Sequence, residues 1–400
     1  MSDCRLAIIA DDLSGALDAA APFAARGADT RVVLSLGVLA ETLDAWHGQW
    51  PAVIAVNTAS RHLQADEAAR RVSEAVCLLE RVNPQQWFKK VDSTLRGQVV
   101  AECRALREAL DIPLLLAPAV PAQGRTVHEA EVWVEGVPLM DTAYQQDACS
   151  TPLIGPVDEA FSASGLALQR YRPGQSMPLP SDDCIADAAS ADELLAIYDA
   201  VFEVGASRLM AGAAGLAEAI AQRCFGASDA ALRSLGSVKA VVYAVGSRSP
   251  RAAEQLRQLC QYVPDIDVVE ANGETAAARC ARPDSSATLD ARVVVPGRSV
   301  TQRSASQVAE AMADQTASII ATWQESEECL LFLTGGDIAM AVLARQGVRY
   351  ITVETEWSPG VALGYVDGDF QRRVMTKAGG FGEPQLLARL HQQIRSTAEC

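Results

Sequence analysis

The sequence has few histidines and no paired cysteine motif. It has four histidines, and its ten cysteines lie singly, without a C-x-x-C pair or a cysteine–histidine group at zinc spacing. His128 and Glu131, three residues apart, are too few ligands for a metal site, so the sequence identifies no metal ligands. Single cysteines are typical of a reducing compartment, and we expect a cytoplasmic protein.

Long hydrophobic runs and an excess of positive charge are also absent. The first apolar run is only five residues long and follows acidic Asp3 closely, so we expect no signal peptide. No run approaches the roughly 20 residues of a membrane-spanning helix. The chain has 34 basic and 50 acidic residues, a formal charge of -16. This charge opposes nucleic acids and anionic membranes, and we expect neither as a partner.

Short apolar runs alternate with amphipathic stretches along the whole chain, which predicts an α/β fold with mostly parallel sheets. Four hundred residues exceed what one hydrophobic core usually supports, so two domains are expected. A stretch rich in Ala, Ser and Gly, Gly226–Gly236, separates two series of elements. We therefore predict domains at residues 1–230 and 237–400, each a mostly parallel sheet flanked by helices, with a ligand cleft between them.

Apolar runs and helical periodicity place the individual elements. In the first series, strands are predicted at Leu6–Ala10, Arg31–Leu36, Ala52–Asn57, Trp87–Asp92 and Pro113–Val120, and helices at Ala65–Leu79, Val100–Leu110, Ala191–Glu203 and Leu216–Cys224. In the second series, strands are predicted at Lys239–Val245, Ile266–Glu270, Arg292–Val295, Cys329–Leu333 and Tyr350–Glu354, and a helix at Ser304–Gln324. Between Val120 and Pro180, prolines and glycines predict loops and short edge strands over a binding site.

Two adjacent carboxylates, Asp11 and Asp12, end the first predicted strand, and a helical pattern follows at Leu13. In open α/β sheets, ligands bind beyond the carboxyl ends of strands, next to helix N-termini. Neighbouring carboxylates repel each other and need a partner, which a metal, a substrate hydroxyl or a lysine would provide. We expect one of the two aspartates to cap the helix, and the other to have a different role.

Three further strand ends carry an arginine beside hydroxyl groups. Lys90 and Asp92 share one face of a predicted strand, and Ser93, Thr94 and Arg96 follow. Arg61 follows Asn57-Thr-Ala-Ser60, and Arg125 lies in Gly124-Arg-Thr126. A solvated charged loop would explain any one of them. Together, ammonium, guanidinium and hydroxyl groups favour a single anionic, oxygen-rich ligand such as a polyol acid.

The C-terminal half has three glycine-containing turns after apolar strands, at Gly246–Pro250, Thr334–Asp337 and Thr376–Gly382. Glycines let backbone N–H groups approach phosphate oxygens, and a helix N-terminus adds partial positive charge. Neither the G-x-x-x-x-G-K-[ST] nor the G-x-G-x-x-G motif is present. A single turn of this kind is usually only a tight turn, but three of them, one beside Lys377, favour phosphate binding.

In order along the chain, these stretches resemble the four-carbon acid sugar kinase family. The matching stretches are Ala10-Asp-Asp-Leu-Ser-Gly-Ala16, Lys89-Lys-Val-Asp-Ser-Thr-Leu-Arg-Gly97, Gly124-Arg-Thr126, Gly246-Ser-Arg-Ser249, Thr334-Gly-Gly-Asp337, Pro359-Gly-Val361 and Lys377-Ala-Gly-Gly-Phe-Gly382. The resemblance implies an N-terminal sugar-acid-binding domain and a C-terminal nucleotide-binding domain. It also implies ATP-dependent phosphorylation of the terminal hydroxyl of threonate, erythronate or a 3-oxo-tetronate.

The resemblance assigns substrate contacts to Asp12, Arg61, Lys90, Val91, Asp92 and Ser93, to which the strand-end pattern adds Arg96 and Arg125. It assigns ATP contacts to Ser247, Ser358, Pro359, Gly360, Val361, Gly379 and Gly380, to which the glycine turns add Lys377. The family commonly has acidic residues where this chain has Asn57 and Ala59, which loosens the substrate identity. Ala362 stands where the family often has a proline.

In-line transfer from ATP and Mg²⁺ needs a base for the acceptor hydroxyl. Asp337 is predicted as that base and Asp12 as a substrate ligand, although either carboxylate fits either role. One alternative function is a sugar-acid lyase or aldolase that uses Lys90 as a Schiff-base amine. The other is a non-catalytic sugar-acid-binding regulator. A homo-oligomer is possible.

Overall fold

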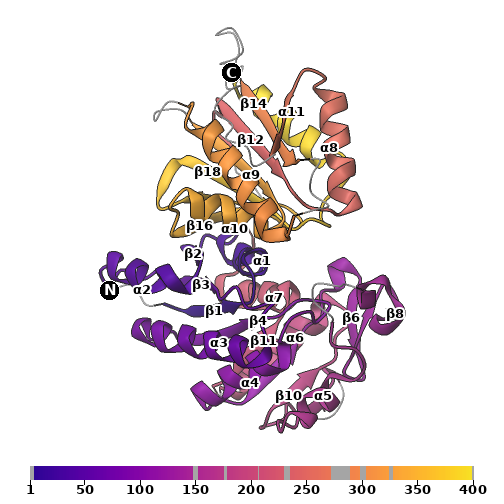
Figure 1. The fold of residues 1–400 in the computed structure, drawn as a ribbon. Coiled ribbons are helices and arrows are strands. Elements are labelled where there is room, and N and C mark those ends of the chain that lie inside the picture. Colours follow the sequence, from indigo (N-terminus) through magenta and orange to yellow (C-terminus); the bar gives the residue numbers. More distant parts are fainter. Residues whose placement is uncertain are drawn as a thin grey trace. The chain divides into compact units, whose positions relative to one another are not determined.

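The fold is described from a computed structural model, which covers residues 4–146, 152–174, 178–205, 207–228, 235–271, 289–297, 303–323 and 328–398. The chain divides into two compact units, Met1–Asp229 and Ala230–Cys400. Part of the predicted boundary segment, residues 229–234, lies outside the described residues. Each unit is a mostly parallel sheet flanked by helices (Figure 1), so the predicted α/β class is confirmed.

In the described part of the first unit, eight strands form one parallel sheet, and a small sheet is separate from it. The parallel strands are β1 (Leu6–Ala10), β2 (Thr30–Val33), β3 (Val53–Asn57), β4 (Gln86–Lys90), β5 (Leu114–Ala117), β9 (Gln169–Tyr171), β10 (Cys184–Ala186) and β11 (Leu209–Gly212). The helices are α1 (Leu13–Ala24), α2 (Leu36–Ala45), α3 (Ala65–Leu79), α4 (Val99–Leu110), α5 (Val157–Ala163), α6 (Ala191–Val204) and α7 (Ala214–Phe225).

The strand order of this sheet is β2-β3-β1-β4-β11-β5-β10-β9, with β1 near the centre. Helices α1, α6 and α7 pack together, and α3 packs against α2 and α4 on the other side of the sheet (Figure 1). The register aligns Ala10 with both Asn57 and Lys90. The residues after β1, β3 and β4 therefore emerge at one edge of the sheet, the carboxyl edge where α/β proteins bind ligands.

Three predicted strands in this unit end earlier than expected. The strand predicted at Trp87–Asp92 ends at Lys90. The strand predicted at Arg31–Leu36 ends at Val33, because Ser35 is the N-cap of α2. The strand predicted at Pro113–Val120 ends at Ala117, directly before Pro118, which has no N–H to donate to a neighbouring strand.

The segment after Val120, predicted as loops and edge strands, forms an antiparallel sheet of β6 (Arg125–His128), β7 (Glu131–Val134) and β8 (Val137–Pro138). A backbone bridge between Val120 and Arg125 attaches it to the segment that follows β5. The chain then continues to helix α5, which was not predicted.

The second unit has seven strands in the order β13-β14-β12-β15-β18-β17-β16. They are β12 (Ala240–Val245), β13 (Asp267–Ala271), β14 (Asp290–Pro296), β15 (Cys329–Thr334), β16 (Tyr350–Ser358), β17 (Val361–Val366) and β18 (Asp369–Lys377). The helices are α8 (Pro250–Tyr262), α9 (Ala305–Ile320), α10 (Gly336–Arg345) and α11 (Leu386–Ala398). Strands β12 to β15 and β18 are parallel, and β17 runs antiparallel to β16 and β18.

The predicted helix at Ser304–Gln324 ends at Ile320, and Gln324 lies outside the described residues. Its N-terminus has a capping box between Ser304 and Gln307. The antiparallel pairs made by β17 were not predicted. No helix in the part of the chain that the structure describes is long and apolar enough to cross a membrane.

Candidate active site

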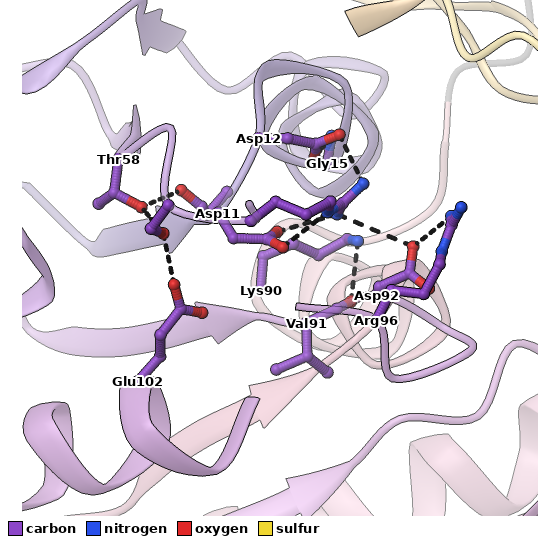
Figure 2. Close-up of polar contacts among 12 residues, drawn as sticks. Asp11, Asp12, Gly15, Thr58, Lys90, Val91, Asp92, Arg96 and Glu102 are labelled. Atoms are coloured by element: carbon purple, nitrogen blue, oxygen red, sulfur yellow. Dashed lines mark hydrogen bonds and ion pairs between the residues drawn. The ribbon is translucent and has the colours of Figure 1, made fainter. Parts of the chain in front are cut away.

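The two carboxylates that follow β1 share one arginine. Arg61 donates from Nε and Nη2 to the two carboxylate oxygens of Asp11, at 2.7 and 2.9 Å, and from Nη1 to Asp12, at 2.7 Å (Figure 2). Asp12 is also the N-cap of α1, and its Oδ1 accepts the N–H of Gly15 at 2.7 Å. One aspartate therefore caps the helix, as predicted, and the partner that the pair requires is a guanidinium.

The local backbone after β3 brings Arg61 to this position. Ala59 has a φ of 50°, and its N–H donates to Asn57 Oδ1 at 2.8 Å. The N–H groups of Ser60 and Arg61 both donate to the backbone oxygen of Asp11. Non-glycine residues in this left-handed region cost roughly 1–2 kcal/mol, so the turn is held by these hydrogen bonds.

Asp92, after β4, is the third carboxylate of the cluster. Its oxygens accept from Arg96 Nε at 3.1 Å and Nη2 at 2.8 Å (Figure 2). They also accept from the N–H of Thr94 at 3.0 Å. Arg61 Nη2 lies 3.8 Å from Asp92 Oδ1. The predicted substrate contacts Asp12, Arg61, Asp92 and Arg96 are thus brought together at the carboxyl edge of the sheet.

Lys90 reaches the same edge from β4. Its Nζ donates to the backbone oxygen of Val91 at 2.9 Å and lies 3.9 Å from Asp18 Oδ2 of α1. Gly15 leaves room for the Asp12 cap, because a Cβ there would lie 2.6 Å from Asp12 Oδ1, whereas its distance of 3.4 Å from Lys90 Nζ is an ordinary contact. Ser93 lies half-buried two residues after Val91.

Arg125, at the start of β6, lies near enough to Asp18 to affect its ionisation. Its guanidinium donates to the backbone oxygen of Gln123 at 2.8 Å and to the Tyr144 hydroxyl at 3.0 Å. The backbone bridge between Val120 and Arg125 places Arg125 beside the segment that follows the carboxyl end of β5.

The carboxylates in this cluster have different electrostatic environments. Burial opposes ionisation of Asp11, but the charges of Arg61 and Lys89 outweigh it and hold the pKa of Asp11 below its usual range. Burial raises the pKa of Asp12, and the charge of Asp11 adds to this shift despite Arg61. Burial also raises the pKa of Asp18. The side chains of Asp12 and Asp18 are 23% and 26% exposed, against 3% for Asp11, so these two can contact a ligand.

The predicted ATP-binding residues also lie at one edge, the carboxyl edge of the second unit. The register aligns Val245 with Thr334, Thr334 with Lys377, Lys377 with Val361, and Val361 with Ser358. Four turns follow or connect the strands at these positions. They contain Ser247, Asp337, Gly379 and Gly360. Gly379 lies against Ser247, since a Cβ on it would be 1.9 Å from Ser247 Oγ.

Two helices begin at this edge of the second unit. Ser249 is the N-cap of α8, which has Pro250 in its first turn, and Gly335, with a φ of 100°, is the N-cap of α10. Asp337 lies exposed in the first turn of α10. Unpaired N–H groups of helix N-termini suit an anion such as phosphate.

Lys377 is buried, and its ammonium group is engaged with the backbone. Its Nζ donates to the carbonyl oxygens of Ala378, Gly379 and Phe381, at 3.0, 3.1 and 3.1 Å. Burial, together with the charge of Arg251, lowers the pKa of Lys377 to about 8. Contact between Lys377 and phosphate stays a prediction. The three hydrogen bonds show that Lys377 stabilises the glycine loop.

Three residues of these edges were missed in the sequence. Asp18 lies beside Lys90, Glu102 pairs with Lys89 below the first edge, and Gln255 donates to the backbone oxygens of Phe381 and Glu383. Glu102 and Gln255 occupy buried helix positions. Each of these two is a polar residue among apolar residues at helical spacing, and this pattern could have identified them in the sequence. Among the described residues, no group of three or more His, Cys, Asp or Glu side chains is arranged to hold a metal ion.

Comparisons with known proteins agree with this arrangement. Residues 6–154 match a family model described as a sugar-binding N-terminal domain, and residues 240–387 match one described as a nucleotide-binding C-terminal domain. A D-threonate kinase from Bordetella bronchiseptica is 30% identical, covering 98% of this chain and 97% of the relative. The chain belongs to the four-carbon acid sugar kinase family. It is a phosphotransferase, so neither the lyase nor the non-catalytic regulator is retained.

Other family members extend the comparison. A D-threonate kinase from Salmonella typhimurium is 29% identical over 96% of both chains, and a D-erythronate kinase from Heliobacterium modesticaldum is 25% identical over 94% of both. The crystal structure of the DUF1537-family protein HI1011 from Haemophilus influenzae has a TM-score of 0.73 at 18% identity, covering 97% of this chain and 100% of that one. A Bordetella bronchiseptica DUF1537 structure with bound citrate, a domain-swapped dimer, has a TM-score of 0.50 at 27% identity and covers 98% of both chains.

Replacing Arg61 with lysine tests the arginine-centred cluster of this kinase. Lysine keeps the charge but cannot bind Asp11 through two parallel hydrogen bonds and Asp12 through a third. We expect kcat/KM for the sugar acid to fall about 100-fold, because small displacements of positioning groups have effects of this size. The KM for the nucleotide should stay unchanged. Arg70→Lys, at an exposed position of α3, is the matched control and should have little effect on activity. Equal activity of the two variants would contradict the central role of Arg61.

Replacing Lys377 with methionine tests the glycine loop. The three carbonyl groups would lose a charged donor, so we expect the KM for the nucleotide to rise about tenfold, or roughly 1.4 kcal/mol. In the wild-type enzyme this KM should also rise above about pH 8, where the amine loses its proton and one donor. Lys377→Met should lack that pH dependence. Lys239→Met, at an exposed position of the same unit, is the control. A nucleotide KM that Lys377→Met leaves unchanged would rule out this role.

Proposed function

We propose that this chain is an ATP-dependent kinase that phosphorylates the terminal hydroxyl of a four-carbon sugar acid, with D-threonate as the first candidate. Two relatives near 30% identity over almost their whole length carry the name D-threonate kinase. The D-erythronate kinase is 25% identical, and a 3-oxo-tetronate kinase from Salmonella typhimurium is 24% identical. These acids are the second and third candidates.

The observation that carries the proposal is the cluster at the carboxyl edge of the first unit. Lys90 and Arg125 supply positive charge for a carboxylate, and the part-exposed carboxylates of Asp12 and Asp18 are acceptors for substrate hydroxyls. Arg61 is already engaged by Asp11 and Asp12, so its part in the proposal is to hold these two side chains. A related protein was crystallised with bound citrate, which is also a hydroxy acid.

The second unit supplies the nucleotide site in this proposal. The N-termini of α8 and α10, the hydroxyl of Ser247 and the N–H groups around Gly379 and Gly380 are donors for phosphate oxygens. The exposed arginines Arg248 and Arg251 add positive charge at the start of α8. The segment Ser358–Val361 joins β16 to β17 at the same level of the sheet.

Phosphoryl transfer depends on positioning and on charge neutralisation more than on covalent help from the protein. Mg²⁺ would enter with the nucleotide, with phosphate oxygens and water as its ligands. Asp12 orients the acceptor hydroxyl in this proposal, and Asp337 takes its proton. The burial that raises the pKa of Asp12 also suits it to accept a proton, so both carboxylates are tested below.

The function is tested by measuring ADP release with a panel of four-carbon acids. We expect turnover with D-threonate that requires ATP and Mg²⁺, with lower kcat/KM for D-erythronate and 3-oxo-tetronates. Analysis of the product by NMR should place the phosphate on the terminal carbon. If no four-carbon acid stimulates ADP release above the background hydrolysis of ATP, the proposed substrate class is wrong.

Asparagine substitutions separate the two candidate bases. We expect Asp337→Asn to lower kcat at least 100-fold with little change in either KM, because a general base contributes roughly 10²–10⁴-fold. Asp12→Asn should mainly raise the KM for the sugar acid. The opposite pattern, a larger kcat loss in Asp12→Asn, would make Asp12 the base. Asp314→Asn, at an exposed position on α9, serves as the control.

A homo-oligomer stays a prediction. Phe202 and Val204 near the end of α6 are 54% and 59% exposed, while Leu194 and Ile197 of the same helix are buried in the unit. A related protein is a domain-swapped dimer in its crystal structure.

A further inference from the structure

A buried ionisable pair lies behind the sugar-acid edge. Lys89 and Lys90 are successive residues of β4, so their side chains point to opposite faces of the sheet. Lys89 Nζ lies 3.0 Å from Glu102 Oε2 of α4, and the two side chains are 0% and 2% exposed. A buried pair of this kind is weak evidence for stability by itself, since apolar residues of similar volume are often as stable.

Glu102 is connected to the residues around Arg61 by two hydroxyl groups. Its Oε1 contacts Ser60 Oγ, Ser60 Oγ lies 2.7 Å from Thr58 Oγ1, and Thr58 Oγ1 lies 2.9 Å from the backbone oxygen of Ala10 (Figure 2). The chain of contacts therefore runs from α4, through the turn that precedes Arg61, to the end of β1.

The protons in this chain can be counted. Three oxygen–oxygen contacts at hydrogen-bond distance require three protons, and the carbonyl of Ala10 supplies none. The hydroxyls of Ser60 and Thr58 supply one each. The N–H of Thr58 also donates to the oxygen of Ala10 but reaches neither of the other two contacts. Among the groups that make these contacts, the carboxyl group of Glu102 can supply the remaining proton. With Glu102 protonated, each contact has a donor: Glu102 donates to Ser60, Ser60 to Thr58, and Thr58 to Ala10.

We propose that Glu102 is a neutral carboxylic acid in the native enzyme and that it acts, through Ser60 and Thr58, as a positioning residue for Arg61. The positioning part of this inference depends on the proposed function, since it assumes that Arg61 organises the sugar-acid site. The protonation state can be tested without it.

The surrounding charges agree with this assignment. Burial is the largest effect and raises the pKa of Glu102, and the negative charge of Asp11 adds to it, whereas Lys89 and the contact with Ser60 oppose it. The charge of Lys89 is shared with Asp11, which helps hold the pKa of Asp11 down. Asp11 comes from the end of β1, Lys89 from β4 and Ser60 from the segment after β3, while Cys103 is the neighbour on α4 itself. In this assignment Asp11 is the ionised carboxylate, paired with Arg61, and Glu102 is the neutral donor beside Lys89.

Glu102→Gln is the discriminating variant. The glutamine amide nitrogen can donate to Ser60 while its oxygen accepts from Lys89, which reproduces the hydrogen bonds of the neutral acid. We expect Glu102→Gln to keep the melting temperature and kcat/KM for the sugar acid within about threefold of wild type. Glu102→Ala removes the donor, and we expect the KM for the sugar acid to rise about tenfold while the KM for ATP is unchanged.

An infrared difference spectrum between wild type and Glu102→Gln at pH 7 provides a direct measurement. It should contain the C=O stretching band of a protonated carboxyl group. Glu108→Gln, at an exposed position of the same helix, is the matched control and should show only the bands of an ionised carboxylate. If the wild-type enzyme turns over no four-carbon acid, the band and the melting temperature still decide the protonation state.

Three outcomes would overturn the proposal. They are the absence of the protonated-carboxyl band, a loss of more than tenfold in kcat/KM in Glu102→Gln, and failure of Glu102→Gln to fold. Each would indicate that the site requires a charged carboxylate at position 102. A tenfold rise of the sugar-acid KM in Glu102→Ala that Glu102→Gln restores would support the positioning role, because loss of stability alone would raise the KM for ATP as well.

Discussion

The first unit depends on the three-way contact between Arg61, Asp11 and Asp12. Two adjacent carboxylates at the end of a buried strand repel each other, and removing one partner from such a cluster typically costs 3–5 kcal/mol. The guanidinium of Arg61 neutralises both, and it joins the carboxyl ends of β1 and β3. The same contact orients the N-terminus of α1, because Asp12 also caps that helix. One side chain, Arg61, therefore links the carboxyl ends of β1 and β3, the N-terminus of α1 and the carboxylates of the candidate site.

The register of the parallel strands explains why the grouping of these residues could be predicted from the sequence. In a parallel sheet the carboxyl ends of neighbouring strands lie at one edge, so polar residues that follow Ala10, Asn57 and Lys90 must meet. The helix at Ala65–Leu79 has the predicted bounds because its apolar residues repeat at helical spacing. The pattern of the sequence gives residue type and strand end, which is enough to group Asp12, Arg61, Lys90 and Asp92.

Which group each side chain of the site contacts could not be predicted from the sequence. Nothing in the sequence distinguishes an arginine that contacts a ligand from one that is saturated by Asp11 and Asp12, because the distinction depends on side-chain distances. Glu102 and Gln255 lie within the apolar stripes of their helices, but the groups they contact are known only once the helices are packed. The antiparallel strand β17 was also missed, although short turns join it to β16 and β18 and the Asp367-Gly368 pair after it is a hairpin signal.

The position of Arg125 has a consequence for how substrate preference evolves in such enzymes. It belongs to the small antiparallel sheet β6–β8, which is separate from the parallel sheet that carries Asp12 and Lys90. Substitutions, insertions and deletions in a separate appendage leave the central βα framework intact. Under the proposed function, changes in the sheet β6–β8 would alter the acid that is selected and leave the parallel sheet unchanged.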